Sequence, residues 1–328
     1  MKNPPQMDLK TLFSPIVGDL TRVDAIIRER LTSEVAMINQ IGAHIVAGGG
    51  KRMRPAVLLL VARALGCKSD EPAQLAAVIE FIHTATLLHD DVVDHADRRR
   101  GRKTANSVWG NAGAVLSGDF LYSRSFQMMV DTGRMATLRV LADATNAIAQ
   151  GEVLQLMNCG DPEVSEARYL RVIELKTAKL FEAAARLGAI AAEQPAPVTE
   201  ALAHYGQSLG LAFQITDDLL DYKADPEQSG KSLGTDLAEG KPTLPLIHAM
   251  QKGTPAQADK IRTAIRDGRL DWLEDVLVAV EQTGGLAYSA ALAATHSDAA
   301  ISALGGIPDS PFKEALKGLA RFAIQRTH

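Results

Sequence analysis

The sequence is poor in cysteine and in aromatic residues. Its two cysteines, Cys67 and Cys159, exclude a disulfide framework and a four-ligand zinc site, and such low usage is typical of a reducing compartment. Aromatic residues make up 5% of the chain, whereas hydrophobic residues as a whole make up 46%. Because that hydrophobic fraction is mainly Ala, Leu, Val and Ile, the composition favours long helices over a sandwich of short strands.

The sequence also lacks a long apolar run and an excess of positive charge. The apolar run Ala56 to Ala62 ends at Arg63, far short of the roughly 20 residues that cross a bilayer. The first ten residues carry prolines and an aspartate where a signal peptide needs a continuous apolar segment. The net charge of -4 provides no general field that would hold a nucleic acid. We therefore expect a cytoplasmic protein that does not bind nucleic acid.

The predicted fold class is all-α. Apolar residues recur with helical spacing, as at Leu58, Val61, Ala62 and Leu65. We find no stretch of strict alternation bounded by turn residues, and clusters of proline and glycine separate the helical segments. None of these clusters resembles a linker between domains. We expect one domain over residues 1–328, with residues 1–19 as a loose N-terminal segment.

One acidic motif of the form DDxxD occurs twice. Its two copies are Asp90-Asp91-Val92-Val93-Asp94 and Asp217-Asp218-Leu219-Leu220-Asp221. For a chain with 23 aspartates, chance gives roughly 0.1 copies of such a motif. Both copies follow an apolar helical run, so the repetition indicates a function.

The spacing of each motif predicts a binding face for a divalent cation. Residues four positions apart lie on one face of a helix, so Asp90 and Asp94 project together, as do Asp217 and Asp221. Like charges at this spacing destabilise a helix, and no lysine or arginine is interleaved to relieve the repulsion. A bound cation would relieve it. Clustered carboxylates favour Mg2+, which commonly bridges a few carboxylates to substrate phosphates.

Basic residues accompany both motifs. The segment 48–55 places Lys51, Arg52 and Arg54 after three glycines, in an order that differs from a P-loop. A basic run, 98–103, follows the first motif, and further lysines follow the second. In a chain of net charge -4, these local clusters match small diphosphates better than a nucleic acid.

The chain resembles the trans-type polyprenyl diphosphate synthases. The stretches that carry the resemblance, in the family's order, are GGGKRMRP, IEFIHTATLLHDDVVD, RRRGRKTAN, GEVLQLMN, KTAKLFEAAA, FQITDDLLDY and EGKPTLPLIHAM. The resemblance extends from about residue 20 to the C-terminus, and within the family it is greatest to the bacterial octaprenyl diphosphate synthases of quinone biosynthesis. It implies a single helical bundle of the isoprenoid synthase type around a central cavity.

The resemblance also implies a site for two substrates and Mg2+, with more than one ion per site. The implied metal ligands are Asp90, Asp94 and Asp217, supported by Asp91, Asp218 and Asp221. The implied contacts of the allylic diphosphate are Arg99, Lys176, Thr177, Gln214, Lys231 and Lys241. Those of isopentenyl diphosphate are Lys51, Arg54, His83 and Arg100. Asp90, Asp94, Asp217 and Lys176 are the implied catalytic residues of a sequential condensation onto farnesyl or geranyl diphosphate.

The small side chains at two positions before the first motif imply a long product. In the family, bulky side chains at the fifth and fourth positions before the first aspartate stop chain growth early, and here these residues are Ala85 and Thr86. On a helical wheel Thr86 falls beneath Asp90, whereas Ala85 lies to the side. We expect the growing chain to run along this helix and to reach octaprenyl length.

Other functions explain fewer of these sequence features. A terpene cyclase would carry an Asn/Ser/Glu signature in place of the second motif, and a helical phosphohydrolase built on His89 and Asp90 would leave that motif unexplained. A shorter-chain synthase stays open, as does a noncatalytic subunit of a heteromeric synthase, although both motifs are intact. The resemblance further implies a homodimer, and we expect transient membrane contact for product release.

Overall fold

The computed structural model describes residues 8–222 and 233–325, so Lys231, one of the expected diphosphate contacts, lies outside the described residues. The described elements are α1 (Leu9–Leu12), η1 (Ser14–Ile16), α2 (Val17–Arg30), α3 (Ala36–Ala47), α4 (Met53–Ala64), α5 (Glu71–Val93), β1 (Arg98–Arg99), β2 (Arg102–Lys103), α6 (Ala105–Asp131), α7 (Met135–Asn158), α8 (Glu166–Ile173), η2 (Glu174–Ala178), α9 (Lys179–Ala191), α10 (Ala196–Leu220), α12 (Thr235–Ala238), α13 (Leu244–Lys252), α14 (Pro255–Asp267), η3 (Leu270–Trp272), α15 (Leu273–Gln282), α16 (Gly285–Ala303) and α17 (Pro311–Gln325). The all-α prediction is confirmed. The strands β1 and β2 have two residues each and form a short antiparallel hairpin, and the other described elements are helices.

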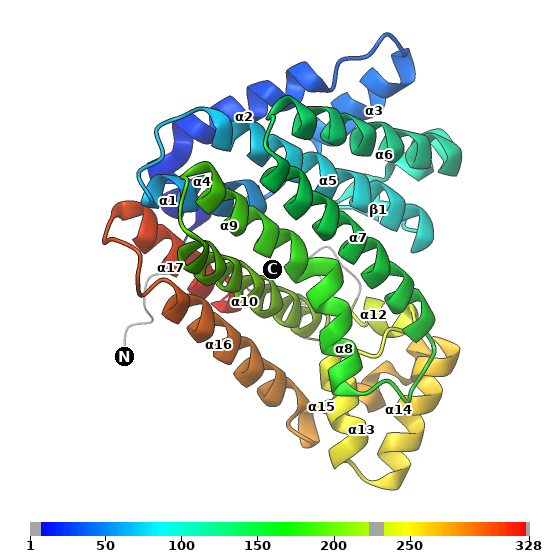
Figure 1. The fold of residues 1–328 in the computed structure, drawn as a ribbon. Coiled ribbons are helices and arrows are strands. Elements are labelled where there is room, and N and C mark those ends of the chain that lie inside the picture. The colour runs from blue at the N-terminus through cyan, green and yellow to red at the C-terminus, as the bar shows by residue number, and fades with distance from the viewer. Residues whose placement is uncertain (1–7, 223–232, 326–328) are drawn as a thin grey trace.

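The helices form a bundle in which α9 and α10 are central. The helix α10 packs against α9 and α16, α9 packs against α4, and α5 packs along α6. Figure 1 shows α2, α3 and α6 at one end of the bundle and α13, α14 and α15 at the other. The segments that carry the two acidic motifs, α5 and α10, therefore belong to one helical assembly.

The main hydrophobic core joins both ends of the chain. Its buried residues run from Leu12 and Ile16 near the N-terminus to Ala323 in α17. The helix α1 packs against α17, which explains why these early side chains are buried. The segment expected to be loose, residues 1–19, thus contains helical turns from Leu9 onward and contributes to the core.

A close approach of backbones sets the position of η2, which is a single π-helical turn. A Cβ on Gly210 of α10 would lie 2.5 Å from the Cα of Ala178 in this turn, so only glycine permits the observed contact. A π-helical turn inserts an extra residue into a helix and is frequent at functional sites. The contact with Gly210 holds the turn, and the side chains it carries, directly against α10.

Four described helices exceed twenty residues, namely α5, α6, α7 and α10. The helix α6 joins two segments across a nonhelical residue, Gly110. None of the individual helices in residues 8–222 and 233–325 combines the length and the hydropathy that a membrane span requires. One pair bent by 62°, α15 with its preceding turn (Leu270–Gln282) and α16, meets the criteria by length and composition alone.

Candidate functional site

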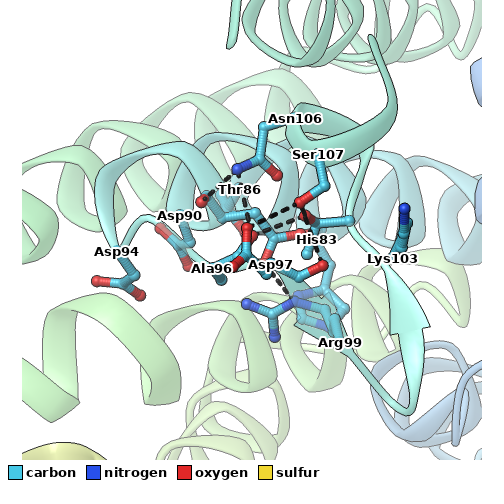
Figure 2. Close-up of polar contacts among 12 residues, drawn as sticks. His83, Thr86, Asp90, Asp94, Ala96, Asp97, Arg99, Lys103, Asn106 and Ser107 are labelled. Atoms are coloured by element: carbon cyan, nitrogen blue, oxygen red, sulfur yellow. Dashed lines mark hydrogen bonds and ion pairs between the residues drawn. The ribbon is translucent and has the colours of Figure 1, made fainter. Parts of the chain in front are cut away.

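The first acidic motif lies at the C-terminal end of α5. Asp90 belongs to the last turn, and Asp94 caps the helix through its N–H, which donates to the Asp90 carbonyl at 2.7 Å. Figure 2 shows both carboxylates at this end of the helix. Burial raises the pKa of Asp90, and the charge of Asp94 raises it further, while Lys176 opposes the shift. A cation near this pair would stabilise its charged form.

Asp91 has a different role from its neighbours. Its side chain is buried, and one of its oxygens accepts a hydrogen bond from Nε of Arg99 at 2.7 Å. The amide of Asn106 donates to the backbone carbonyls of Asp91 and Ala96, so the hairpin and the start of α6 are tied to the end of α5 (Figure 2). Asp91 therefore positions Arg99 beside the first motif.

The second acidic motif divides in a similar way. Asp217 is half-buried near the end of α10. Asp218 is buried and accepts hydrogen bonds from the Tyr169 hydroxyl at 2.6 Å and from the Gln214 amide at 2.7 Å. Burial raises the pKa of Asp218 to about 7.

The last carboxylate of this motif, Asp221, accepts hydrogen bonds from the backbone N–H groups of Thr235 at 3.1 Å and Asp236 at 2.9 Å. These two groups begin α12, so Asp221 stabilises the N-terminal end of that helix. The carboxylates predicted to act in support, Asp91, Asp218 and Asp221, each have a protein partner in this structure.

The donor chemistry fits magnesium, but the carboxylates do not form a closed cage. Among the described residues, no group of three or more His, Cys, Asp or Glu side chains is arranged to hold a metal ion. Magnesium usually takes one or two protein carboxylates and completes its octahedral shell with water and substrate phosphates. The carboxylates at the ends of α5 and α10 therefore suit ions that bridge to a diphosphate.

Two lysines from distant segments approach the first motif. Nζ of Lys176, on the π-helical turn, lies 3.8 Å from Oδ2 of Asp90. Nζ of Lys241, just before α13, lies 3.4 Å from Oδ1 of Asp94 and also pairs with Glu239. Burial alone would lower the pKa of Lys241, but the charges of Asp94 and Glu239 raise it above its ordinary value. Lys176 and Lys241 therefore bring two amino groups from different segments of the chain to the carboxylates of the first motif.

The hydrogen bonds of Asp218 extend through Gln214 to the π-helical turn. The hydroxyl of Thr177 donates to Oε1 of Gln214 at 2.8 Å, and the amide of Gln214 donates to Asp218. Tyr169 in α8 completes this chain of hydrogen bonds. The structure thus brings together Thr177 and Gln214, which the sequence places 37 residues apart.

A second basic cluster forms around the glycine-rich segment before α4. Nη1 of Arg54 lies 3.1 Å from Nε2 of His83. The guanidinium of Arg100 donates to the carbonyl of Gly49, so the hairpin folds onto this segment. Lys51 is exposed on the same segment. Burial lowers the pKa of Arg54 to about 10, opposed by Glu80, so Arg54 stays charged near neutral pH.

The environment of His83 predicts a neutral ring. Burial lowers the pKa of His83 well below 6.5, and the positive charge of Arg54 lowers it further. Because Arg54 donates to Nε2, the proton of the neutral ring belongs on Nδ1. Since the folded pKa lies below the unfolded value, this residue makes the free energy of unfolding fall as the pH drops below about 6.5.

In nitrogen-detected NMR of histidine-labelled protein, the chemical shifts of the His83 ring nitrogens should not change between pH 8 and pH 6. A His83→Gln variant assigns the signal. A ring that titrates near the ordinary value of about 6.5 would contradict the burial and the cationic surroundings described above.

Several residues of this site were missed by sequence reasoning. Glu152 lies 2.5 Å from Nζ of Lys176, and burial raises the pKa of Glu152 to about 7. Glu80 is buried in α5 and pairs with Arg52, which holds the glycine-rich segment to that helix. Tyr169 is fully enclosed around its bond to Asp218. The one available signal was an acidic residue inside a mostly apolar helical stretch, as for Glu80 and Glu152.

Comparison with known proteins gives a consistent set of similarities. A family model described as polyprenyl synthetase matches residues 35–281. The octaprenyl diphosphate synthase of Escherichia coli (strain K12) is 53% identical over 321 residues, which covers 98% of this chain and 99% of that protein. The all-trans-nonaprenyl-diphosphate synthase (geranyl-diphosphate specific) of Rhodobacter capsulatus is 45% identical, with 96% of this chain and 97% of that protein covered.

A solved structure is also similar over its whole length. The polyprenyl synthase of Caulobacter crescentus CB15, crystallised in complex with calcium and isoprenyl diphosphate, has a TM-score of 0.94 and 42% sequence identity. The match covers 99% of this chain and 100% of that chain. Both the sequence and the arrangement of helices are therefore similar from one end to the other.

Proposed function

The chain belongs to the polyprenyl synthetase family and is a prenyltransferase, and on that premise we propose that it makes octaprenyl diphosphate for a quinone side chain. The observation that carries the proposal is the convergence of Lys176 and Lys241 on Asp90 and Asp94 at the end of α5. Carboxylates, lysines and the nearby Arg99 together provide the charges needed to bind a metal-complexed diphosphate. The 53% identity to the octaprenyl diphosphate synthase of Escherichia coli supports the product assignment.

The allylic diphosphate belongs at the acidic end of α5. Asp90, Asp94 and Asp217 would hold Mg2+, which stabilises negative charge on the departing diphosphate oxygen when bound. Lys176 and Lys241 reach the same region and neutralise the remaining charge. The calcium and isoprenyl diphosphate in the Caulobacter structure support a site for a divalent cation with a diphosphate.

Isopentenyl diphosphate belongs at the second basic cluster. Arg54, His83 and Arg100 converge beside the glycine-rich segment, and the neutral ring of His83 accepts from Arg54. This cluster only anchors its diphosphate, while the alkene faces the allylic carbon. Loss of the allylic diphosphate leaves a cation that the alkene attacks, and the departing diphosphate takes the proton that restores a double bond. No protein nucleophile is required.

A direct assay tests this function. The purified chain is incubated with radiolabelled isopentenyl diphosphate, farnesyl or geranyl diphosphate and Mg2+, and the products are separated by chain length. We expect extension to octaprenyl length. A chain that performs no extension with either starter would overturn the proposal, and products that stop at 15 or 20 carbons would favour the shorter-chain alternative.

We also propose that the chain forms a homodimer through α6 and α7. Large exposed apolar surface marks interaction sites, and these two helices carry nine of the 15 exposed large hydrophobic residues among the described part of the chain. The exposed apolar side chains of these helices are Val108, Val115, Leu116, Phe126, Val130, Met135, Val153, Leu156 and Met157. Sedimentation equilibrium should give twice the mass of the chain, and Leu116→Lys should shift it to the monomer mass. A monomeric wild-type chain would overturn the proposal.

The cytoplasmic location and the transient membrane contact stay predictions.

A further inference from the structure

A carboxylate of α7 lies closer to the Lys176 ammonium than the first acidic motif does. Oε2 of Glu152 lies 2.5 Å from Nζ of Lys176, whereas Oδ2 of Asp90 lies 3.8 Å from the same atom. The side chains of Glu152 and Lys176 are 30% and 19% exposed, so solvent only partly screens this pair. The ammonium is therefore shared unequally, with its short hydrogen bond directed to Glu152.

The backbone makes this geometry specific. A Cβ on Gly151 would lie 2.6 Å from the backbone nitrogen of Lys176, so α7 can touch the π-helical turn only through a glycine. The residue after that contact point is Glu152, and its side chain meets the lysine of the turn it packs against. The contact depends on two unusual features, a glycine in a long helix and a π-helical turn. Together they place the side chains of Glu152 and Lys176 next to each other.

From this geometry we infer that Glu152 is a positioning residue that keeps the Lys176 ammonium off Asp90. This inference rests on the proposed function. Glu152 leaves Asp90 available to Mg2+ and presents the remaining protons of Lys176 to the allylic diphosphate. Without the Glu152 charge, the flexible lysine side chain would close the 3.8 Å gap and pair with Asp90. The lysine would then compete with the metal ion for the same carboxylate.

The test is Glu152→Gln at about pH 8, above the pKa of about 7 that burial gives Glu152, so that the substitution preserves the size of the side chain and removes its charge. Mg2+ is titrated calorimetrically into the full chain in the presence of inorganic diphosphate, so that no turnover is needed. We expect the Mg2+ concentration for half-saturation to rise about 10- to 100-fold. In the steady state the KM of the allylic starter should rise, while the KM of isopentenyl diphosphate stays unchanged.

Glu174→Gln provides a matched control. Glu174 lies on the same π-helical turn and is 33% exposed, but it pairs with Arg171 at 2.8 Å and accepts from Gln207 at 3.0 Å. This variant should bind Mg2+ like the wild type. Glu152→Asp, which keeps the charge and shortens the reach, should recover part of the loss.

A double-mutant cycle separates positioning from a direct effect of charge on the metal. If Glu152 acts through Lys176, then adding Glu152→Gln to Lys176→Gln should cause no further loss of Mg2+ affinity. An equal loss in both backgrounds, or a Glu152→Gln chain that binds Mg2+ like the wild type, overturns the inference. A wild-type chain that shows this binding pattern yet elongates no starter would overturn the proposed function alone, because calorimetry does not depend on the reaction.

Discussion

Replacement of Asp90 by asparagine is expected to reduce turnover about 10^3-fold, since Asn keeps the shape of the side chain but cannot stabilise a divalent cation. Asp90 is the carboxylate of the first motif that Lys176 approaches, and its buried position raises its pKa in the absence of a metal ion. Loss of this charge removes a ligand where negative charge develops on the leaving diphosphate. The rate constant kcat, measured at saturating substrates and Mg2+, should carry most of the effect.

Asp131→Asn is the matched control for that prediction. Asp131 forms a comparable ion pair, with Arg30 at 3.4 Å, but its side chain is 54% exposed at the end of α6. Its replacement should leave kcat unchanged. An Asp90→Asn enzyme with a near-normal rate would mean that the metal site lies elsewhere.

Replacement of Thr86 by phenylalanine is expected to shorten the product by several isoprene units. Thr86 lies one turn before Asp90 and is half-buried, and its hydroxyl donates to the His83 carbonyl at 2.8 Å. A ring at this position would obstruct the path along α5 beneath the acidic motif. Thin-layer chromatography of the dephosphorylated products reports the change directly, and an unchanged distribution would refute the assigned path.

Thr84→Phe provides a closely matched control. Thr84 makes the same kind of bond, from its hydroxyl to the Glu80 carbonyl at 2.7 Å, but it lies about 200° around the helix from Thr86. It lines a small pocket together with Phe81 and Leu121, on the side of α5 that faces α2 and α6. Its replacement should leave product length unchanged, with thermal unfolding measured for both variants.

Ala85 is a poorer position than Thr86 for testing the path of the growing chain. Its side chain is fully buried in the main core, so a phenylalanine there would overpack it at a cost of about 1–3 kcal/mol or more in the free energy of unfolding. A shortened product from Ala85→Phe would therefore mix a packing effect with an effect on the path. Thr86, which the helical wheel places beneath Asp90, is therefore the better position for the substitution.

The local features of this site could be predicted because they depend on helical spacing alone. Asp90 and Asp94 share one end of α5, and Gln214 lies one turn before Asp218 on α10, as periodicity requires. The all-α fold follows from the same periodicity. These features involve only residues within a few helical turns of one another, so the order of residues in the sequence is enough to predict them.

The protein partners of the supporting aspartates could not be predicted from helical periodicity. Periodicity treats both motifs alike, yet Asp91 pairs with Arg99, and Asp221 supports the start of α12. These partners come from segments that follow each motif at different distances along the chain. Only folding brings them to the carboxylates.

By itself, the sequence determined the helices, the two acidic faces and, through its motifs, the family to which the chain belongs. The tertiary structure decided which charges meet. Lys176 and Lys241 come from different segments of the chain to Asp90 and Asp94, and Glu152 reaches Lys176 because a glycine lets α7 touch a π-helical turn. The physical reason is that electrostatic contacts depend on distance in space. Helical periodicity reports that distance only within a single helix, whereas contacts between helices are set by how closely their backbones pack.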